Sequence, residues 1–365
     1  MKIFKHYFPI TVLILIFASN GINGQDNPEE LLLNNFRPVS IYKIPETRIS
    51  EAKYPVIDMH SHPYPKSIEA LNNWVKTMDA AGIDKTVIMT YTTGAEFDSL
   101  FRVYSRYPDR FILFCGFDYT GYDQSGFGPD AVKELERCIK IGARGVGELG
   151  DKGKGLFYSK PVKAFGMHID DPRMDLLLKK CADLSIPVSI HVAEPIWMYQ
   201  KMDSTNDGLM NAYSWRLDNQ PGIVDHAGMI RILENAVKKH PETTFIALHY
   251  ANCSYDLAIL GSLLDKYPNL YSGMGARFAE TAAIPRYMAD FLARHQDRIV
   301  YGTDMGTDLE MYRYTFRILE SKDEHFYESN YSYHWPLHGF GLDDGILKKI
   351  YRANALKILK LEGEN

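Results

Sequence analysis

From residue 54 to the end of the chain, short apolar runs alternate with amphipathic segments. Each run is rich in β-branched residues and leads through a polar turn to apolar positions spaced three and four apart, the spacing of one helix face. The runs predict strands at 54–62, 84–91, 110–118, 143–149, 186–193, 243–250, 269–274 and 298–304. The amphipathic segments predict helices near 67–82, 95–107, 129–142, 171–185, 225–240, 254–267, 280–295, 308–321 and 343–361.

Strands that alternate with helices predict an α/β protein with a parallel sheet. Eight repeats fit a closed (β/α)8 TIM barrel better than an open sheet, and no G-x-G-x-x-G motif follows the first strand. Aromatic-rich insertions, 151–169 and 194–224, follow the fourth and fifth strands and should roof the mouth of the barrel. The final amphipathic helix is expected to pack outside the barrel.

The first 24 residues differ from the rest of the chain. Lys2 and Lys5 precede an apolar run at 8–17, which is shorter than the roughly 18 residues of a spanning helix, so the pattern predicts a secretory signal peptide. An uncleaved anchor is the alternative. No cysteine lies near the cleavage region, so we expect a periplasmic or secreted protein without a stable membrane anchor. Residues 25–53 are polar and predict an N-terminal arm before a barrel domain at 54–361.

The composition of the chain limits the kinds of molecule that the protein is expected to bind. The chain of 365 residues is 45% hydrophobic with a formal charge of -5. It has no run of like charges and no basic stripe, which argues against a nucleic acid partner. The four cysteines form no C-x-x-C motif and are read as buried thiols. A small-molecule substrate is therefore expected, and a homo-oligomer is left open.

The strand ends carry the candidate chemistry. In Asp58-Met-His60-Ser-His62, strand alternation places the three polar side chains on one face. Four further strand ends carry Glu148, His191, His249 and Asp304. The C-terminal ends of all barrel strands meet in one mouth, so these groups should converge. Imidazoles and carboxylates around an open position are typical of a catalytic site for Zn²⁺ or a similar divalent ion.

Several motifs in order carry a family resemblance: Ile-Asp-Met-His-Ser-His, Val-Gly-Glu-Leu-Gly, Asp-Asp-Pro-Arg-Met-Asp, Pro-Val-Ser-Ile-His-Val, Thr-Thr-Phe-Ile-Ala-Leu-His, Tyr-Gly-Thr-Asp and Ile-Tyr-Arg-Ala-Asn-Ala. From about residue 54 to 359 the chain resembles the decarboxylase-like and lactonase-like branch of the amidohydrolase superfamily. That resemblance implies that His60, His62, His191 and Asp304 are metal ligands. It implies that His249 binds a second metal or acts as an acid or base on the substrate.

Glu148 is the ambiguous position. In the one-metal branch a ligand on the fourth strand is generally absent, whereas in related nucleases of the superfamily a Glu after Gly bridges two metals. We expect one tightly held ion, with room for a second. Zn²⁺ is expected first and Mn²⁺ second.

These residues permit a specific chemistry. A divalent ion lowers the pKa of bound water toward ~7. Asp304 can take the proton from the attacking water and pass it to the leaving group, while His249 or the metal polarises a carbonyl. Asp58 is expected to orient a ligand. Arg277 is a candidate for a substrate carboxylate, and Trp197 for an aromatic ring or sugar face.

The sequence therefore predicts an exported metal-dependent hydrolase of an ester, lactone or amide of a small, anionic or aromatic molecule. A non-oxidative decarboxylase of an aromatic or unsaturated acid is the alternative, because the same ligands serve both reactions. A non-catalytic binding protein is disfavoured, because no ligand position has been lost.

Overall fold

The structure is a computed structural model that describes residues 27–158, 162–331, 333–361 and 363. The chain divides into two compact units, Met1–Arg37 and Pro38–Asn365. The described part of the first unit holds two short turns, η1 (Pro28–Glu30) and η2 (Leu33–Asn35). The predicted signal peptide lies outside the described residues. No helix within the described ranges has the length and apolar character needed to cross a membrane.

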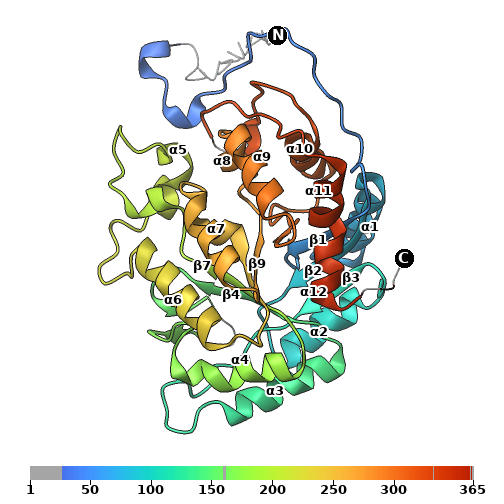
Figure 1. The fold of residues 1–365 in the computed structure, drawn as a ribbon, viewed down its shortest axis with the longest axis vertical. Helices are drawn as coiled ribbons and strands as arrows, with labels where there is room; N and C mark the ends of the chain where they lie inside the picture. Colours follow the sequence, from blue (N-terminus) through green and yellow to red (C-terminus); the bar gives the residue numbers. More distant parts are fainter. Residues whose placement is uncertain (1–26, 159–161, 332, 362, 364–365) are drawn as a thin grey trace, which may run out of the picture. The chain divides into compact units, whose positions relative to one another are not determined.

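The second unit contains the predicted barrel of parallel strands (Figure 1). In order around the barrel, the strands are β1 (Val56–Ser61), β2 (Ile83–Met89), β3 (Phe111–Phe114), β4 (Val146–Asp151), β7 (Val188–Val192), β8 (Phe245–Ala247), β9 (Leu270–Gly273) and β10 (Ile299–Val300). Pairing of Cys115 with Val146 joins β3 to β4. The backbone N–H of Met59 in β1 donates to the carbonyl of Tyr301, just after β10, at 3.0 Å. These links close the ring.

Each barrel strand leads to a helix, as the periodicity predicted. The helices are α1 (Ile68–Ala81), α2 (Gly94–Tyr104), α3 (Pro129–Ile141), α4 (Asp175–Asp183), α6 (His226–Lys239), α7 (Leu257–Lys266), α9 (Pro285–Arg294) and α10 (Leu309–Glu320). The single helix predicted over 280–295 is wrong: a short helix, α8 (Phe278–Ala282), ends before α9 begins. Pro285 has no N–H to continue α8, and its fixed φ suits the first turn of a new helix.

The two insertions follow β4 and β7, as predicted, and so lie at the mouth end of the barrel. Residues 151–169 contain an antiparallel hairpin of β5 (Gly155–Leu156) and β6 (Ala164–Phe165), and η3 (Pro172–Met174) leads into α4. Residues 194–224 contain η4 (Ile196–Tyr199), α5 (Leu209–Ala212) and η5 (Tyr213–Trp215). This second loop has its own apolar cluster, formed by Met198, Ala212 and Leu217.

The C-terminal segment packs on the barrel rather than at a distance from it. It consists of α11 (Asp344–Lys348), the π-turn η8 (Lys349–Ala353) and α12 (Asn354–Leu359). Ala355, Ile358 and Leu359 share one apolar cluster with Ile57 and Val300 from the strands. Leu359 also lines a hollow with Phe111, at the start of β3. We therefore place α12 against the end of the barrel opposite the mouth. The sequence predicted packing outside the barrel but did not say at which end.

Asp151, the last residue of β4, holds the β5–β6 hairpin against the barrel through hydrogen bonds. Its buried carboxylate accepts the backbone N–H of Gly153 at 3.0 Å and of Gly155 at 3.1 Å. The other oxygen lies 2.6 Å from Nδ1 of His168, just beyond β6. This hydrogen bond raises the pKa of His168 above its ordinary value, against the opposing effect of burial.

We expect His168→Gln, which cannot be protonated, to lower the free energy of unfolding by about 1.5–3 kcal/mol at pH 6, the range for a hydrogen bond to a charged group. The folded pKa is raised, so this stabilisation is fully present below the unfolded pKa of about 6.5 and is lost as pH rises through the folded value. Urea unfolding of both proteins at pH 6 and pH 9 measures the difference. An equal difference at the two pH values would show that the pair carries no ionic component.

Candidate metal centre at the barrel mouth

A bulge in β1 sets the direction of its polar side chains. Asp58 and Ser61 pair with β2 residues only two apart, so three steps of β1 match two of β2. Met59 packs in the barrel interior, and the bulge keeps His60 on the same side. The prediction that Asp58 shares a face with His60 and His62 is therefore wrong, because the extra residue breaks the two-residue period.

Asp58 acts on the backbone instead of on an imidazole. Its buried carboxylate accepts the N–H of His60 and the N–H of Thr303, each at 3.0 Å, and the hydroxyl of Thr303 at 2.7 Å. Burial raises the pKa of Asp58 to about 6, although these hydrogen bonds oppose the shift. Asp58 thus ties the end of β1 to the segment after β10 that carries Asp304.

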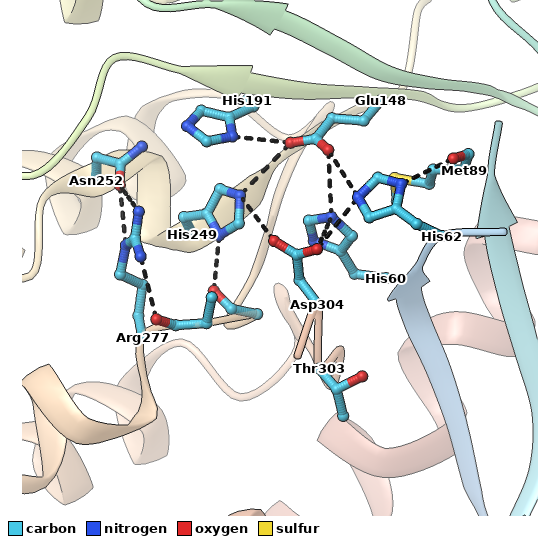
Figure 2. Close-up of polar contacts among 12 residues, drawn as sticks. His60, His62, Met89, Glu148, His191, His249, Asn252, Arg277, Thr303 and Asp304 are labelled. Carbon is cyan, nitrogen blue, oxygen red and sulfur yellow. Dashed lines mark hydrogen bonds and ion pairs between the residues drawn. The ribbon is translucent and has the colours of Figure 1, made fainter. Parts of the chain in front are cut away.

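Glu148 lies between two pairs of histidines (Figure 2). Its Oε2 is 3.0 Å from Nε2 of His62 and 3.5 Å from Nε2 of His60. Its Oε1 is 2.8 Å from Nδ1 of His191 and 3.5 Å from Nε2 of His249. Each carboxylate oxygen therefore faces a different pair.

Asp304 completes the cluster from the segment after β10. Its Oδ1 is 3.1 Å from Nε2 of His62 and accepts the hydroxyl of Tyr64 at 3.3 Å. Its Oδ2 is 3.7 Å from Nε2 of His249. All six strand-end residues that the sequence singled out thus come together, and they form three overlapping groups of three whose ligand atoms lie within 4.8 Å of one another: His60, His62 and Glu148; His60, His249 and Asp304; Glu148, His191 and His249.

The hydrogen bonds of two rings show which nitrogens face the centre as lone pairs. Nδ1 of His62 lies 2.9 Å from the carbonyl of Met89, and Nδ1 of His249 lies 2.7 Å from the carbonyl of Gly275. A carbonyl only accepts, so both Nδ1 atoms are protonated, and a neutral ring presents a lone pair at Nε2. Burial lowers the pKa of His249 to about 4, which keeps that ring neutral.

The lone pair on Nε2 of the neutral His249 ring faces oxygens of Glu148 and Asp304, and such groups repel one another unless a metal ion lies between them. In addition, both ring nitrogens of His60 and Nε2 of His249 are buried without a hydrogen-bond partner, an arrangement that is costly in the absence of some other ligand. Imidazole nitrogen and carboxylate oxygen are the donors that Zn²⁺ and Mn²⁺ accept. The residues at the mouth therefore fit a divalent metal ion.

Both central carboxylates are anions at neutral pH. Removal from water raises the pKa of Glu148, but contact with the surrounding histidines outweighs this effect and holds the pKa well below its usual range. Desolvation likewise opposes ionisation of Asp304, yet His60 and His62 leave its pKa below its ordinary value.

A left-handed turn sets the direction of the His249 side chain. The sequence predicted a strand to residue 250, but β8 ends at Ala247, and the residues from His249 to Asn252 have φ values of 51° to 58°. Such backbone costs roughly 1–2 kcal/mol per residue. The amide of Asn252 donates to the carbonyls of Val192 at 2.9 Å and Ala193 at 3.2 Å, which holds the turn against β7.

The two predicted substrate-binding residues each contact other residues of the protein. Arg277 is buried and donates to Oδ1 of Asn252 at 2.9 and 2.6 Å. The ring of Trp197 lies over Gly208, where an added Cβ would come within 2.3 Å of the indole, and its centroid is 6.1 Å from that of Trp335. Trp215, which lies in the same loop, is exposed.

Among the residues that the structure describes, the other histidines do not join the three groups. His226 donates from Nε2 to the carbonyl of Asn252 at 2.9 Å and so supports the left-handed turn. His240 contacts Asp175, and His295 lies 3.6 Å from Asp265.

Sequence reasoning missed two residues that touch the cluster, Tyr64 and Glu194. Glu194 lies 3.5 Å from Nε2 of His191. Tyr64 follows His62 by two positions and Glu194 follows His191 by three. A polar residue just beyond a ligand-bearing strand end is the signal that could have identified both.

Solved structures share this fold. A 2,6-dihydroxybenzoate decarboxylase, crystallised with 2,6-dihydroxybenzoate, is 16% identical over 86% of this chain and 100% of its own, with a TM-score of 0.54. A 5-carboxyvanillate decarboxylase from Novosphingobium aromaticivorans, crystallised with manganese, is 14% identical over 87% and 100%, with a TM-score of 0.52. A TIM-barrel protein from Bordetella bronchiseptica is 18% identical over 84% and 98%, with a TM-score of 0.53.

At these identities the likeness is one of fold. None of the curated proteins compared matches the chain. The sequence model of the family described as Amidohydrolase matches residues 47–361, which span the barrel and all six residues of the cluster. The chain belongs to the amidohydrolase family.

Proposed function

We propose that the protein is a metal-dependent hydrolase that cleaves an ester, lactone or amide bond of a small molecule. The position of Glu148 carries the proposal, because one oxygen faces His60 and His62 and the other faces His191 and His249. A carboxylate in that position can serve two ions. Paired ions are a recurring arrangement in enzymes that direct water at a polarised bond.

We assign the residues to two ion positions by their distances. His60, His62 and Asp304 would hold one ion, His191 and His249 would hold the other, and Glu148 would contact both. A divalent ion supplies a Lewis acid and brings the pKa of a water molecule toward ~7. This division extends the sequence-based expectation of one tightly held ion to two.

Asp304 is the proposed proton carrier. It is ionised at neutral pH, and the hydroxyl of Tyr64 fixes its Oδ1. Oδ2 is then the oxygen that accepts a proton from the attacking water and returns it to the leaving group.

His249 fits the role of a ligand better than that of a carbonyl polariser. Its proton lies on Nδ1, directed at the carbonyl of Gly275. Nε2 therefore has a lone pair and no hydrogen to donate to a substrate oxygen.

A non-oxidative decarboxylase is the second candidate. It is supported by solved structures of similar fold that are decarboxylases of 2,6-dihydroxybenzoate and 5-carboxyvanillate. Against it, Arg277, the expected partner for a substrate carboxylate, is engaged by Asn252 and lies 3.6 Å from both Glu194 and Glu280.

The proposed protein is also exported. The proposal of export rests on Lys2, Lys5 and the short apolar run at 8–17. The exported protein should begin near Gln25, and N-terminal sequencing of material recovered outside the cytoplasm measures this. An intact Met1 would contradict cleavage.

The two reactions leave different products. Protein loaded with Zn²⁺ or Mn²⁺ is incubated with lactones, aryl esters and N-acyl compounds in ¹⁸O-labelled water, and separately with hydroxybenzoates. We expect one ¹⁸O atom in the carboxylate product of the first set and no CO₂ from the second. Release of CO₂ without labelled hydrolysis product would replace the proposed activity with decarboxylation.

Two substitutions separate proton transfer from metal binding. Asp304→Asn keeps an oxygen donor but cannot carry the proton, so kcat/KM should fall by about 10²–10⁴ while bound metal is largely retained. Glu148→Ala removes the group shared by both histidine pairs and should lose most of the metal, measured by elemental analysis. His240→Gln, at a residue that contacts Asp175 and not the cluster, is the control and should keep both. Near-normal turnover by Asp304→Asn would show that Asp304 only binds metal.

A further inference from the structure

His191 differs from His62 and His249 in the partner of its outer ring nitrogen, which is the nitrogen that points away from the centre of the cluster. In His62 and His249, Nδ1 donates to a backbone carbonyl and Nε2 faces the centre of the cluster. In His191 the ring is reversed, with Nδ1 2.8 Å from Glu148 and Nε2 3.5 Å from Oε2 of Glu194. The outer contact of His191 is therefore a carboxylate and not a carbonyl.

Glu194 is built into the wall of the mouth. Only 8% of its side chain is exposed, and it follows His191 at the point where the chain leaves β7. Its Oε1 forms an ion pair with the ammonium of Lys152, and its Oε2 lies 3.6 Å from the guanidinium of Arg277. Burial raises the pKa of Glu194, but His191, Lys152 and Arg277 outweigh this and hold the carboxyl ionised.

We infer that Glu194 is a positioning residue that keeps the proton of His191 on Nε2, so that Nδ1 is the nitrogen available to a metal ion. The inference rests on the proposed metal-dependent function. A neutral imidazole has one N–H, and a buried anion beside Nε2 favours the proton on that atom. A carboxylate behind a ligand imidazole also raises its basicity and fixes the orientation of its ring.

The distance identifies the present contact as electrostatic. At 3.5 Å it is longer than the 2.7–3.2 Å of an ordinary N–H···O bond. Catalytic contacts are often long in structures that hold no ligand. The field of the carboxylate acts on the ring at this range because both side chains are shielded from water, with 12% of His191 exposed.

Lys152 and Arg277 keep Glu194 in place. The ammonium of Lys152 lies 4.8 Å from the centroid of the Tyr158 ring, which fixes the cation on its second side. Arg277 joins Glu194 to Asn252, the residue that holds the turn carrying His249. Arg277 thus supports both histidines of one pair, and this explains its burial better than substrate binding does.

The test compares Glu194→Gln with Glu280→Gln. Both carboxylates lie 3.6 Å from Arg277, but Glu280 accepts from Tyr333 and contacts none of the clustered histidines. Competition with a chromophoric chelator gives the affinities for Zn²⁺ and Mn²⁺. We expect about 10–100-fold weaker binding by Glu194→Gln and a near-normal affinity of Glu280→Gln. Equal losses, or none, would overturn the inference.

A measurement on the unsubstituted protein keeps the inference falsifiable if Glu194→Gln folds poorly. Ring ¹⁵N shifts of labelled histidine in the Zn²⁺-loaded protein report which nitrogen carries the proton. We expect His191 to be protonated at Nε2, and protonation at Nδ1 would overturn the inference. If the unsubstituted protein binds neither metal, the proposed function itself fails. Normal binding that Glu194→Gln leaves unchanged removes only the role of Glu194.

Discussion

Negative charge confined in a space with little water is the constraint on which the barrel mouth depends. Four carboxylates meet there, from Glu148, Asp304, Glu194 and Glu280, and none of these side chains is more than 21% exposed. Like charges interact strongly where water is excluded. Lys152 and Arg277 offset Glu194 and Glu280. Within the described ranges, the side-chain contacts of Glu148 and Asp304 are to imidazoles and the Tyr64 hydroxyl, so the centre of the mouth is where a cation stabilises most.

The fold departs from regular geometry to build this centre. The bulge in β1 turns His60 inward, and the left-handed turn after β8 presents His249. Buried hydrogen bonds offset the strain, each contributing roughly 1 kcal/mol. Asp58 binds the backbone beside His60 and at Thr303, and Asn252 binds β7. These two polar side chains therefore position His60 and His249 through the main chain.

The barrel and its six clustered residues were predictable because both leave local signals. Alternating periods mark strands and helices, and the parallel sheet carries every strand end to one mouth, whatever the separation in sequence. The break before Pro285 was also readable, since proline marks a helix start. The side of β1 on which the Asp58 side chain lies was not predictable, because a bulge leaves no periodic pattern in the sequence. Contacts such as Lys152 with Glu194 join separate loops, and no spacing along the chain encodes them.

Charge balance links the number of ions to the kind of substrate. With neutral histidines, the four carboxylates against Lys152 and Arg277 leave the mouth with a formal charge of minus two. One divalent ion cancels that charge, and a second makes the mouth positive. Arg277 already contacts Asn252 and two carboxylates, so its positive charge is largely offset and attracts an anionic substrate only weakly. An anionic substrate would therefore be drawn mainly by the second ion, and a site with one ion would suit a neutral lactone or ester better.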